Sequence, residues 1–434
     1  MSSASIRSAA VALGAFALVV GSVGALHFAK LRGLKHAQAA TLPSAMKLAP
    51  LAQEHAGPVP PFAGLDLTRM VVSDHDATAA LPQGRTAHLT IDARLQRAAV
   101  ALMKRHRIPE ASIVIMDADT GAILAYASHL ASGPARDLAV EATAPSASVF
   151  KLVTATALVE KEGVGADTRA CFPRSAGQRI VASDLVVDPL RDKWCETLGT
   201  AMGKSENAVF ARLAQEKLDE PTLETAARAF GYGAPLAFDV PVQPGKLEIP
   251  QNAGDTALGF ARTAAGFWNT TLSPLQAAEM SAIVARGGES IRPHVVARIT
   301  SATGAVEYEA PAPESHRAIT EDAARAVGAM MEHTVTEGTS YRAFHDAHRT
   351  PFVPVPVAGK TGTLTGEGAH GVEPRLYTWF TGFAPARPAH AGERRVAIAV
   401  LVVNKPRWHV KANVVAREML REVYRDEHRA VASR

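Results

Sequence analysis

The feature that most constrains the fold of this chain is the position of its β-rich segments, which fall into two widely separated groups. An early group, 112–128, consists of two runs rich in β-branched residues on either side of Asp119-Thr120-Gly121, a pattern typical of a hairpin. A late group comprises the runs 357–364, 376–383 and 395–403, followed by a helical pattern at 412–425. The stretch between the groups is mostly helical in pattern as far as about residue 285. We therefore predict an α+β fold in which a central antiparallel sheet takes strands from both ends of the chain, with a helical subdomain inserted between them.

The N-terminus contains an uncharged apolar stretch, residues 9–26. As a helix it would span about 27 Å, close to the ~30 Å hydrocarbon core of a bilayer. An Ala-x-Ala sequence at 37–39 leaves a cleavable signal peptide as the alternative. Because that sequence lies beyond three basic residues, we predict an uncleaved transmembrane anchor at 1–30. The basic residues after the helix argue for a cytoplasmic C-terminus, by the positive-inside rule.

Composition limits the remaining organisation and the class of protein. Residues 31–85 are rich in Ala and Pro and are predicted to be a linker, 86–425 a globular domain, and 426–434 a short tail. The net charge of +4 is too small to indicate a nucleic-acid surface, and two cysteines exclude a Cys₄ zinc site. His345 and His348 have no third ligand in the pattern, so no metal site is predicted.

Ser148 and Lys151 form an S-x-x-K motif at the start of an apolar helical pattern. At this spacing the hydroxyl and the amine lie on one face of a helix, and the helix N-terminus favours a developing oxyanion. Lysine can act as a base only when neutral, which requires its pKa to fall from about 10.4 to near neutrality through burial or a neighbouring cation. Taken alone, Ser148 is more typical of an N-cap serine than of a nucleophile.

Two further motifs follow in order. Ser205 and Asn207 form S-x-N, in which a second hydroxyl can relay a proton and an amide can hold a substrate backbone. The preceding Gly199–Ser205 stretch resembles a phosphate-binding loop but has one residue too few between its glycines, so nucleotide binding is rejected. The third motif is K-T-G-T, in which lysine and hydroxyls on a strand suit a carboxylate and glycine permits close backbone approach. It consists of Lys360, Thr361, Gly362 and Thr363.

The set of S-x-x-K, S-x-N and K-T-G resembles the penicillin-binding transpeptidase domain of class B penicillin-binding proteins, within the serine acyltransferases that include β-lactamases. Other segments resemble this family too. They are L-T-I-D-A-R-L-Q at 89–96, D-A-D-T-G-A-I-L-A at 117–125, T-L-S-P-L-Q-A-A at 271–278, A-R-G-G at 285–288, E-G-T at 337–339 and W-F-T-G-F-A-P at 379–385. The resemblance covers about 86–424.

The resemblance implies a role for each motif residue. Ser148 would be the acylated nucleophile and Lys151 its general base, while Ser205 would pass the proton to the departing D-alanine. Asn207 would hold the donor-peptide amide, and the backbone N–H groups of Ser148 and Thr363 would form the oxyanion hole. The residues that would position the terminal carboxylate are Lys360, Thr361, Gly362 and Thr363.

The implied activity is a peptidoglycan D,D-transpeptidase that cross-links D-Ala-D-Ala stem peptides and is acylated by β-lactams. It needs no cofactor. Its substrate lies outside the cytoplasm, so we expect a single-pass protein of the bacterial inner membrane with a periplasmic catalytic domain, against the charge count at the anchor. The 31–85 segment is too short for the large domain that usually precedes this one in the family, so a partnership with a wall-synthesis polymerase, which is usual in the family, is left open.

Cys171 and Cys195 lie between the first two motifs. In an oxidising compartment a disulfide here would stabilise the fold by about 3 kcal/mol, and two buried free thiols are the alternative.

The sequence leaves several activities open. A D,D-carboxypeptidase shares the acyl-enzyme and differs only in using water as the acceptor. A non-catalytic β-lactam sensor or membrane scaffold is another alternative, and the intact motifs argue against an idle scaffold. A β-lactamase is disfavoured, because residues 231–250 lack the E-x-x-L-N pattern of one lactamase class.

Overall fold

The structure, a computed structural model, describes residues 62–173, 179–250, 256–267, 269–366, 374–390, 392–405 and 407–425. The predicted anchor, the predicted linker up to residue 61 and the predicted tail lie outside these residues. Within the described ranges, no helix combines the length and the apolar character needed to cross a bilayer.

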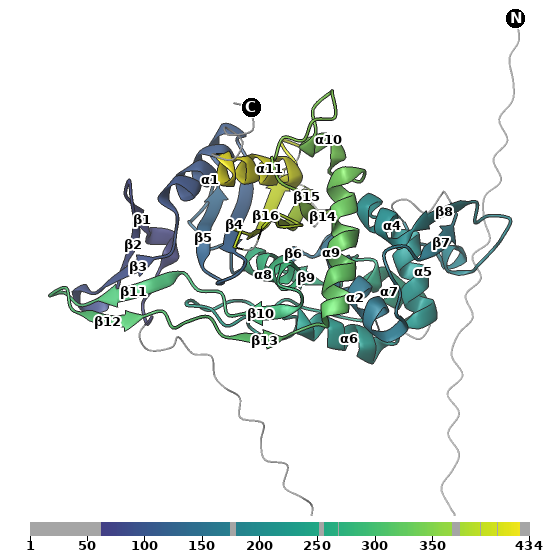
Figure 1. Cartoon of the computed structure of the whole chain (residues 1–434), viewed down its shortest axis with the longest axis horizontal. Helices are drawn as coiled ribbons and strands as arrows, with labels where there is room; N and C mark the ends of the chain where they lie inside the picture. The colour runs from purple at the N-terminus through teal and green to yellow at the C-terminus, as the bar shows by residue number, and fades with distance from the viewer. Residues whose placement is uncertain are drawn as a thin grey trace, which may run out of the picture. The chain divides into compact units, whose positions relative to one another are not determined.

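The central antiparallel sheet takes its strands from both ends of the chain, as the sequence predicts (Figure 1). Its order is β14-β15-β16-β4-β5, so the late strand β16 pairs with the early strand β4, with Val400 opposite Ile113. This order leaves β14 at an edge of the sheet. The strands are β4 (Glu110–Asp117), β5 (Ile123–Leu130), β14 (Ala358–Gly366), β15 (Arg375–Ala384) and β16 (Val396–Asn404).

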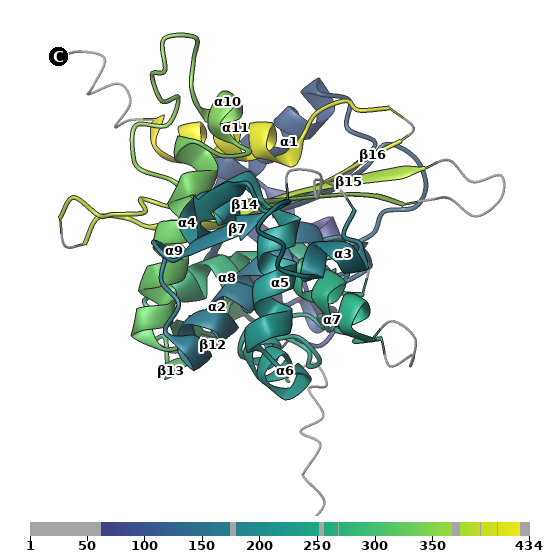
Figure 2. The same cartoon turned by 90° about the vertical axis from the view of Figure 1, so that its right-hand side faces the viewer.

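Both faces of this sheet are buried, which explains the nearly continuous apolar runs of its strands. On β4, Ile113 packs in the core beneath α1 (Ala93–Arg105) and α11 (Ala412–Val423), whereas the next residue, Val114, belongs to the core on the opposite face. Successive side chains of a strand point to opposite faces, so each strand contributes to both cores. Figure 2 shows the sheet between α1 and α11 on one side and α8 (Pro274–Ala285) on the other.

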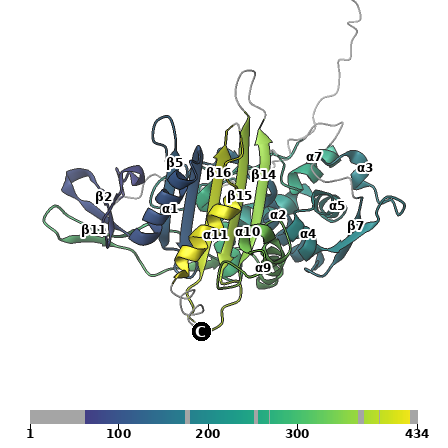
Figure 3. The same cartoon turned by 90° about the horizontal axis from the view of Figure 1, so that it is seen from above.

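The helical subdomain lies between β5 and β14 in the chain and beside the β14 edge of the sheet in space (Figure 3). Its helix α9 packs against both α4 and β14 and so links the subdomain to the sheet. The helices of this region are α2 (Lys151–Glu162), α3 (Ala182–Leu185), α4 (Leu198–Lys204), α5 (Asn207–Lys217), α6 (Glu220–Ala229), α7 (Thr256–Ala264), α9 (Glu321–Thr336) and α10 (Tyr341–Phe344). Short strand pairs join it to the rest: β6 (Ala144–Pro145) with β9 (Thr271–Leu272), and β10 (Glu289–Ile291) with β13 (Ser315–Arg317).

The predicted linker boundary is wrong for residues 62–85, which are part of the folded domain. They supply β1 and β2 of a sheet in the order β1-β2-β3-β11-β12, in which β3 pairs with β11, a strand that follows α8 in the chain. Alanines and prolines gave no visible period there, and the strand that completes the sheet is more than 200 positions away. The elements are η1 (Leu67–Arg69), β1 (Val71–Val72), β2 (Ala77–Ala80), η2 (Pro82–Gly84), β3 (Thr86–Leu89), β11 (Val296–Thr300) and β12 (Val306–Glu309).

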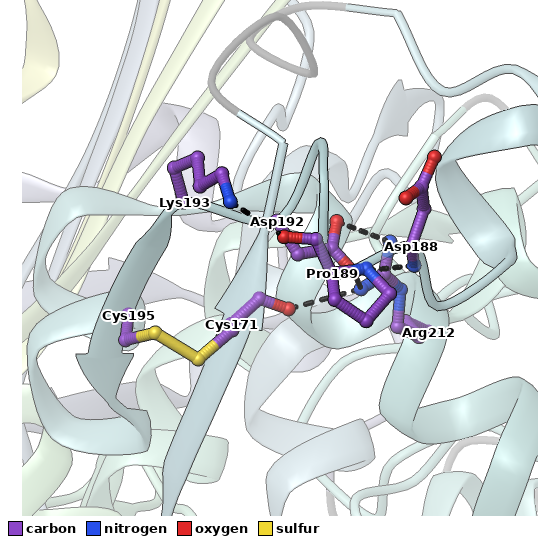
Figure 4. The surroundings of a disulfide bond; sticks show 7 residues. All are labelled: Cys171, Asp188, Pro189, Asp192, Lys193, Cys195 and Arg212. Atoms are coloured by element: carbon purple, nitrogen blue, oxygen red, sulfur yellow. Dashed lines mark hydrogen bonds and ion pairs between the residues drawn. A yellow bond between two sulfur atoms is a disulfide. The ribbon is translucent and has the colours of Figure 1, made fainter.

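The two cysteines are joined by a disulfide in the hairpin of β7 (Arg169–Phe172) and β8 (Trp194–Thr197), where they are directly opposite each other. Beside it the buried Arg212 donates to the carbonyl oxygen of Cys171 at 2.9 Å and to the Asp192 carboxylate at 2.7 Å (Figure 4). Arg212 also donates to the carbonyl oxygens of Asp184 and Val186, so these contacts hold residues 184–192 against α5.

Candidate active site

Ser148 lies in a single turn of 3-10 helix, η3 (Ala147–Phe150), that continues directly into α2. Three residues later, Lys151 begins α2 and is fully buried. Its Nζ lies 2.9 Å from Ser148 Oγ. The motif spacing therefore places the hydroxyl and the amine in contact, as the sequence predicts.

The Lys151 amine has two further partners. Its Nζ lies 2.7 Å from Asn207 Oδ1 and 2.6 Å from the carbonyl oxygen of Ala265. Both atoms can only accept hydrogen bonds. A neutral amine has two N–H groups and one lone pair, so donation to these two acceptors leaves the lone pair for the Ser148 hydroxyl proton.

Burial is the main cause that holds the pKa of Lys151 well below its ordinary value, and the positive charge of Lys360 lowers it further. Glu206, the central residue of S-x-N, acts in the opposite direction on the pKa of Lys151. The pKa of Glu206 is itself raised, first by burial and then by Glu196. These causes favour a neutral Lys151 amine, the form that can accept a proton.

Ser205 follows the last turn of α4 in a left-handed conformation with φ of 63°. Its Oγ lies 2.9 Å from Nζ of Lys360, which also donates to the carbonyl oxygen of Thr361 at 2.8 Å. Burial lowers the pKa of Lys360 to about 7. The second hydroxyl and the second lysine therefore form a pair of their own, from elements 155 positions apart.

The edge strand β14 lies close against the Ser148 turn. A Cβ at Gly362 would lie 3.1 Å from the Cβ of Ala147 and 3.3 Å from the carbonyl oxygen of Ser146. Nearby, Trp379 Nε1 donates to the carbonyl oxygen of Pro145 at 2.9 Å. Glycine in K-T-G thus permits the approach that brings the strand edge to the nucleophile.

Thr361 on β14 contacts a residue that the sequence analysis did not assign to the site. Its Oγ1 lies 2.6 Å from Oγ1 of Thr339, which also donates to the carbonyl oxygen of Gly203 at 3.3 Å. Thr339 belongs to the E-G-T segment, and the resemblance of that segment to the family was the feature of the sequence that could have indicated its place in the site. The Ala265 carbonyl carried no signal in the sequence, because any residue type supplies a backbone oxygen.

These motifs surround one cavity of about 640 Å³. Ser148, Ser205 and Asn207 line it together with the last three residues of K-T-G-T, while Lys151 and Lys360 are buried beneath. The disulfide cysteines do not line the cavity. The described lining residues are Ser148, Ser205, Asn207, Gly266, Phe267, Thr339, Thr361, Gly362, Thr363, Leu364, Thr365, Thr378, Trp379, Trp408, Lys411, Ala412 and Asn413.

The described residues contain no group of three or more His, Cys, Asp or Glu side chains that could hold a metal ion. His345 stacks on Tyr341, with ring centroids 4.4 Å apart. The stretch that resembles a phosphate-binding loop forms helix α4 and its C-cap, Ser205.

An α+β fold with a serine hydroxyl against a buried lysine, and a second serine–lysine pair across the same cavity, defines the class of serine acyltransferases. The family model of the penicillin-binding protein transpeptidase domain matches residues 111–424, and the chain belongs to this family.

Curated relatives agree with this assignment. The chain is 28% identical over 366 residues to the peptidoglycan D,D-transpeptidase PbpA of Mycobacterium tuberculosis, an alignment that covers 74% of this chain and 68% of that protein. It is also 28% identical over 318 residues to the penicillin-binding protein PbpB of Mycolicibacterium smegmatis, covering 67% of this chain and 45% of that protein.

Solved structures share the fold. The D,D-transpeptidase domain of a peptidoglycan glycosyltransferase from Eggerthella lenta matches with a TM-score of 0.63 and 23% identity, covering 79% of this chain and 83% of that one. PBPA from Mycobacterium tuberculosis matches with a TM-score of 0.61 and 22% identity, covering 77% and 81%. An imipenem acyl-enzyme complex of penicillin-binding protein A from the same organism matches with a TM-score of 0.59 and 23% identity, covering 78% and 79%.

Proposed function

We propose that this protein is a peptidoglycan D,D-transpeptidase that forms an acyl-enzyme on Ser148 with stem peptides ending in D-Ala-D-Ala. The observation that carries the proposal is the arrangement of hydrogen bonds around Lys151, whose acceptors Asn207 Oδ1 and Ala265 O leave the amine lone pair for Ser148 Oγ. Membership of the family and the named activity of the PbpA relatives support it.

In the first step Ser148 Oγ attacks the carbonyl carbon of the penultimate D-alanine while Lys151 takes the hydroxyl proton. The oxyanion is stabilised by the backbone N–H groups of Ser148 and Thr363. Collapse of the tetrahedral intermediate breaks the peptide bond, and Ser205 gives a proton to the departing amine and takes one from Lys360, so the acyl-enzyme holds a protonated Lys151 and a neutral Lys360. Lys360 holds Ser205 in place at 2.9 Å and supplies positive charge beside the departing carboxylate.

The second step transfers the acyl group to an amine of a neighbouring stem. The amine attacks the ester carbonyl and loses a proton through Ser205 to Lys360, and Ser148 leaves as the alcohol with the proton that Lys151 gives back. Asn207 and the β14 edge hold the donor chain throughout, because an edge strand offers unpaired N–H and C=O groups to an extended peptide. β-Lactams enter through the first step and remain on Ser148, in the manner of the imipenem acyl-enzyme of the relative from Mycobacterium tuberculosis.

The proposal includes the location of the enzyme. The apolar stretch at 9–26 anchors the protein as a single transmembrane helix, and the domain of 86–425, extended by 62–85, works on the outer side of the inner membrane where the stem peptides are. A reporter fused after Arg434 tests this orientation, and a cytoplasmic signal would contradict it.

The first experiment is the intact mass of the full chain after incubation with benzylpenicillin, followed over hours, with Ser148→Ala as control. A long-lived adduct in the wild type that is absent from the variant supports the proposal. No adduct, or one lost within seconds, contradicts it. Incubation with a D-Ala-D-Ala stem and an amine acceptor then separates transpeptidation from hydrolysis by the mass of the product.

A further inference from the structure

The cavity extends well beyond the reactive serine, to the loop that precedes α11. Trp408 and Lys411 line this outer part, and neither belongs to the three motifs. Trp408 is 46% exposed, although it is a large aromatic residue. The mechanism proposed above uses neither residue.

The strand register shows which face of β14 these residues lie on. Thr363 on β14 is directly opposite Thr378 on β15, so the two side chains lie on the same face of the sheet. Thr378 Oγ1 accepts a hydrogen bond from the backbone N–H of Ala412, the first residue of α11, at 3.1 Å. The hydroxyls of Thr363 and, two residues on, Thr365 therefore face the α11 side, where Lys411 is the N-cap.

The register also shows which end of the strand the loop covers. Thr365 is opposite Leu376, and Leu376 is opposite Asn404, from which the loop departs. The other end of the cavity holds Thr361 with the Lys360–Ser205 pair, where the leaving D-alanine is protonated. Trp408 and Lys411 therefore lie on the acyl side of the scissile bond.

The buried side-chain amide of Asn404 holds the loop between β16 and α11 through hydrogen bonds to its backbone. Asn404 Oδ1 accepts from the backbone N–H of His409 at 2.8 Å and of Val410 at 3.4 Å, and its Nδ2 donates to the Val410 carbonyl oxygen at 3.1 Å. The Lys411 ammonium lies 5.7 Å from the centre of the Trp408 ring. The two side chains thus present a flat apolar surface and a positive charge side by side.

The described wall of the cavity carries a positive charge in its outer part. Lys411 is the one charged side chain among the described residues that line it, and the buried Lys151 and Lys360 lie beneath. No carboxylate of the described part of the chain lies within ion-pair distance of Lys411, and none lines the cavity. The outer part is therefore suited to an anionic group.

We propose that Trp408 and Lys411 form a subsite for the donor stem, which binds an aliphatic side arm ending in a free carboxylate on the residue before the D-Ala-D-Ala pair. The inference rests on the proposed function and deepens it by naming the donor class. Trp408 packs against the methylene groups of the arm, and Lys411 donates to its carboxylate.

The test compares two stem pentapeptides that differ only in charge. One carries meso-diaminopimelate before D-Ala-D-Ala with its side-arm carboxylate free, and the other carries the same residue with that carboxylate converted to the carboxamide. The rate of D-alanine release by the full chain in detergent gives kcat/KM for each. The wild type is expected to prefer the free carboxylate by about tenfold.

Substitutions at Lys411 should act on this ratio. Lys411→Met brings the ratio to within about twofold of one, and Lys411→Glu reverses it, whereas Trp408→Ala lowers both rates by a similar factor. Arg407→Met is the matched control, since it removes a positive charge from the same loop at a residue that does not line the cavity, and it should keep the wild-type ratio. The thermal midpoints of the variants establish that each is folded. If Lys411→Glu does not fold, Lys411→Met alone tests the role of the charge.

Two results overturn the inference. A wild-type ratio near one, or an unchanged ratio in Lys411→Met, removes the subsite but leaves the proposed function standing if benzylpenicillin still acylates Ser148. Failure of both the peptides and benzylpenicillin to acylate the wild type removes the proposed function and the subsite with it.

Discussion

Asn207 Oδ1 lies 2.7 Å from Lys151 Nζ, so the second motif directly contacts the base of the first. The acceptor is an uncharged amide, in a site where burial and Lys360 already hold the pKa of Lys151 well below its ordinary value. A carboxylate at this position would stabilise the protonated lysine, whereas the amide does not. The Asn207 amide therefore positions the Lys151 amine without raising its pKa, so the amine can still act as a base.

Asn207→Asp tests this relationship through the pH dependence of acylation. The new carboxylate raises the pKa of Lys151, so a higher pH is needed to produce the neutral amine. The acid limb of the rate of benzylpenicillin acylation should move upward by about one pH unit or more, and the rate at pH 7 should fall at least about tenfold. Stopped-flow acylation between pH 5 and 9 measures both.

Asn207→Ala is the control for this substitution. It removes the same acceptor and adds no charge, so the rate should fall while the acid limb stays at or below its wild-type position. An acid limb that is the same in Asn207→Asp and the wild type would show that Lys151 is not the group whose protonation stops acylation.

The second prediction concerns stability and the buried Lys360. Its pKa is lowered to about 7 in the folded protein, against about 10.4 in an unfolded chain. Between these values the unfolded chain binds more protons, so the free energy of unfolding rises with pH, by up to about 1.4 kcal/mol per pH unit for one group. Below pH 7 both states are protonated and the contribution no longer changes.

Urea unfolding at pH 7 and pH 9 should therefore show a smaller rise in Lys360→Met than in the wild type. Some rise remains in the variant, because Lys151 has a lowered pKa as well. Lys104→Met, which removes an exposed lysine of α1, should leave the wild-type rise in place. Equal rises in Lys360→Met and the wild type would contradict the lowered pKa.

The sequence predicts the central sheet well, because its strands carry β-branched runs that both buried faces require. The hairpin of β4 and β5, the three late strands and α11 are each confirmed within a few residues. The sheet that contains residues 62–85 could not be predicted in the same way. Its strands are only two to five residues long, and β3 depends on pairing with β11, which no local pattern reveals.

In the site, too, contacts between residues close in sequence could be predicted, whereas contacts between distant residues could not. Ser148 and Lys151 are predictable as a pair because three residues of helix fix their contact. The contact between Lys360 and Ser205 depends on tertiary structure, and the sequence indicated it only through the resemblance of whole motifs to a family. Ala265 contributes a backbone carbonyl, which no motif indicates, and Thr339 was indicated only as part of the E-G-T segment, without its contact with Thr361.

The third prediction tests the close approach at Gly362. In Gly362→Ala the new Cβ presses on Ala147 and Ser146 at 3.1 and 3.3 Å, so the Ser148 turn must move by a few tenths of an ångström. We expect benzylpenicillin acylation to slow by roughly ten- to a hundredfold, with a loss of about 1–3 kcal/mol in stability. Gly165→Ala is the matched control, since a Cβ there meets nothing within 4 Å, and it should change neither quantity appreciably. A normal acylation rate in Gly362→Ala would mean that the strand edge does not position the nucleophile.

The last prediction concerns the disulfide between Cys171 and Cys195, which closes a loop of 24 positions. Cross-linking a loop of this length restricts the unfolded chain and contributes about 3 kcal/mol. Replacing both cysteines by serine should lower the free energy of unfolding by about that amount, and reductant should lower that of the wild type equally. The double variant should be insensitive to reductant, which separates the disulfide from other effects of the reagent. Equal stability of the oxidised wild type and the double variant would contradict this account, because the buried contacts of Arg212 with Cys171 O and Asp192 would then hold the loop without the cross-link.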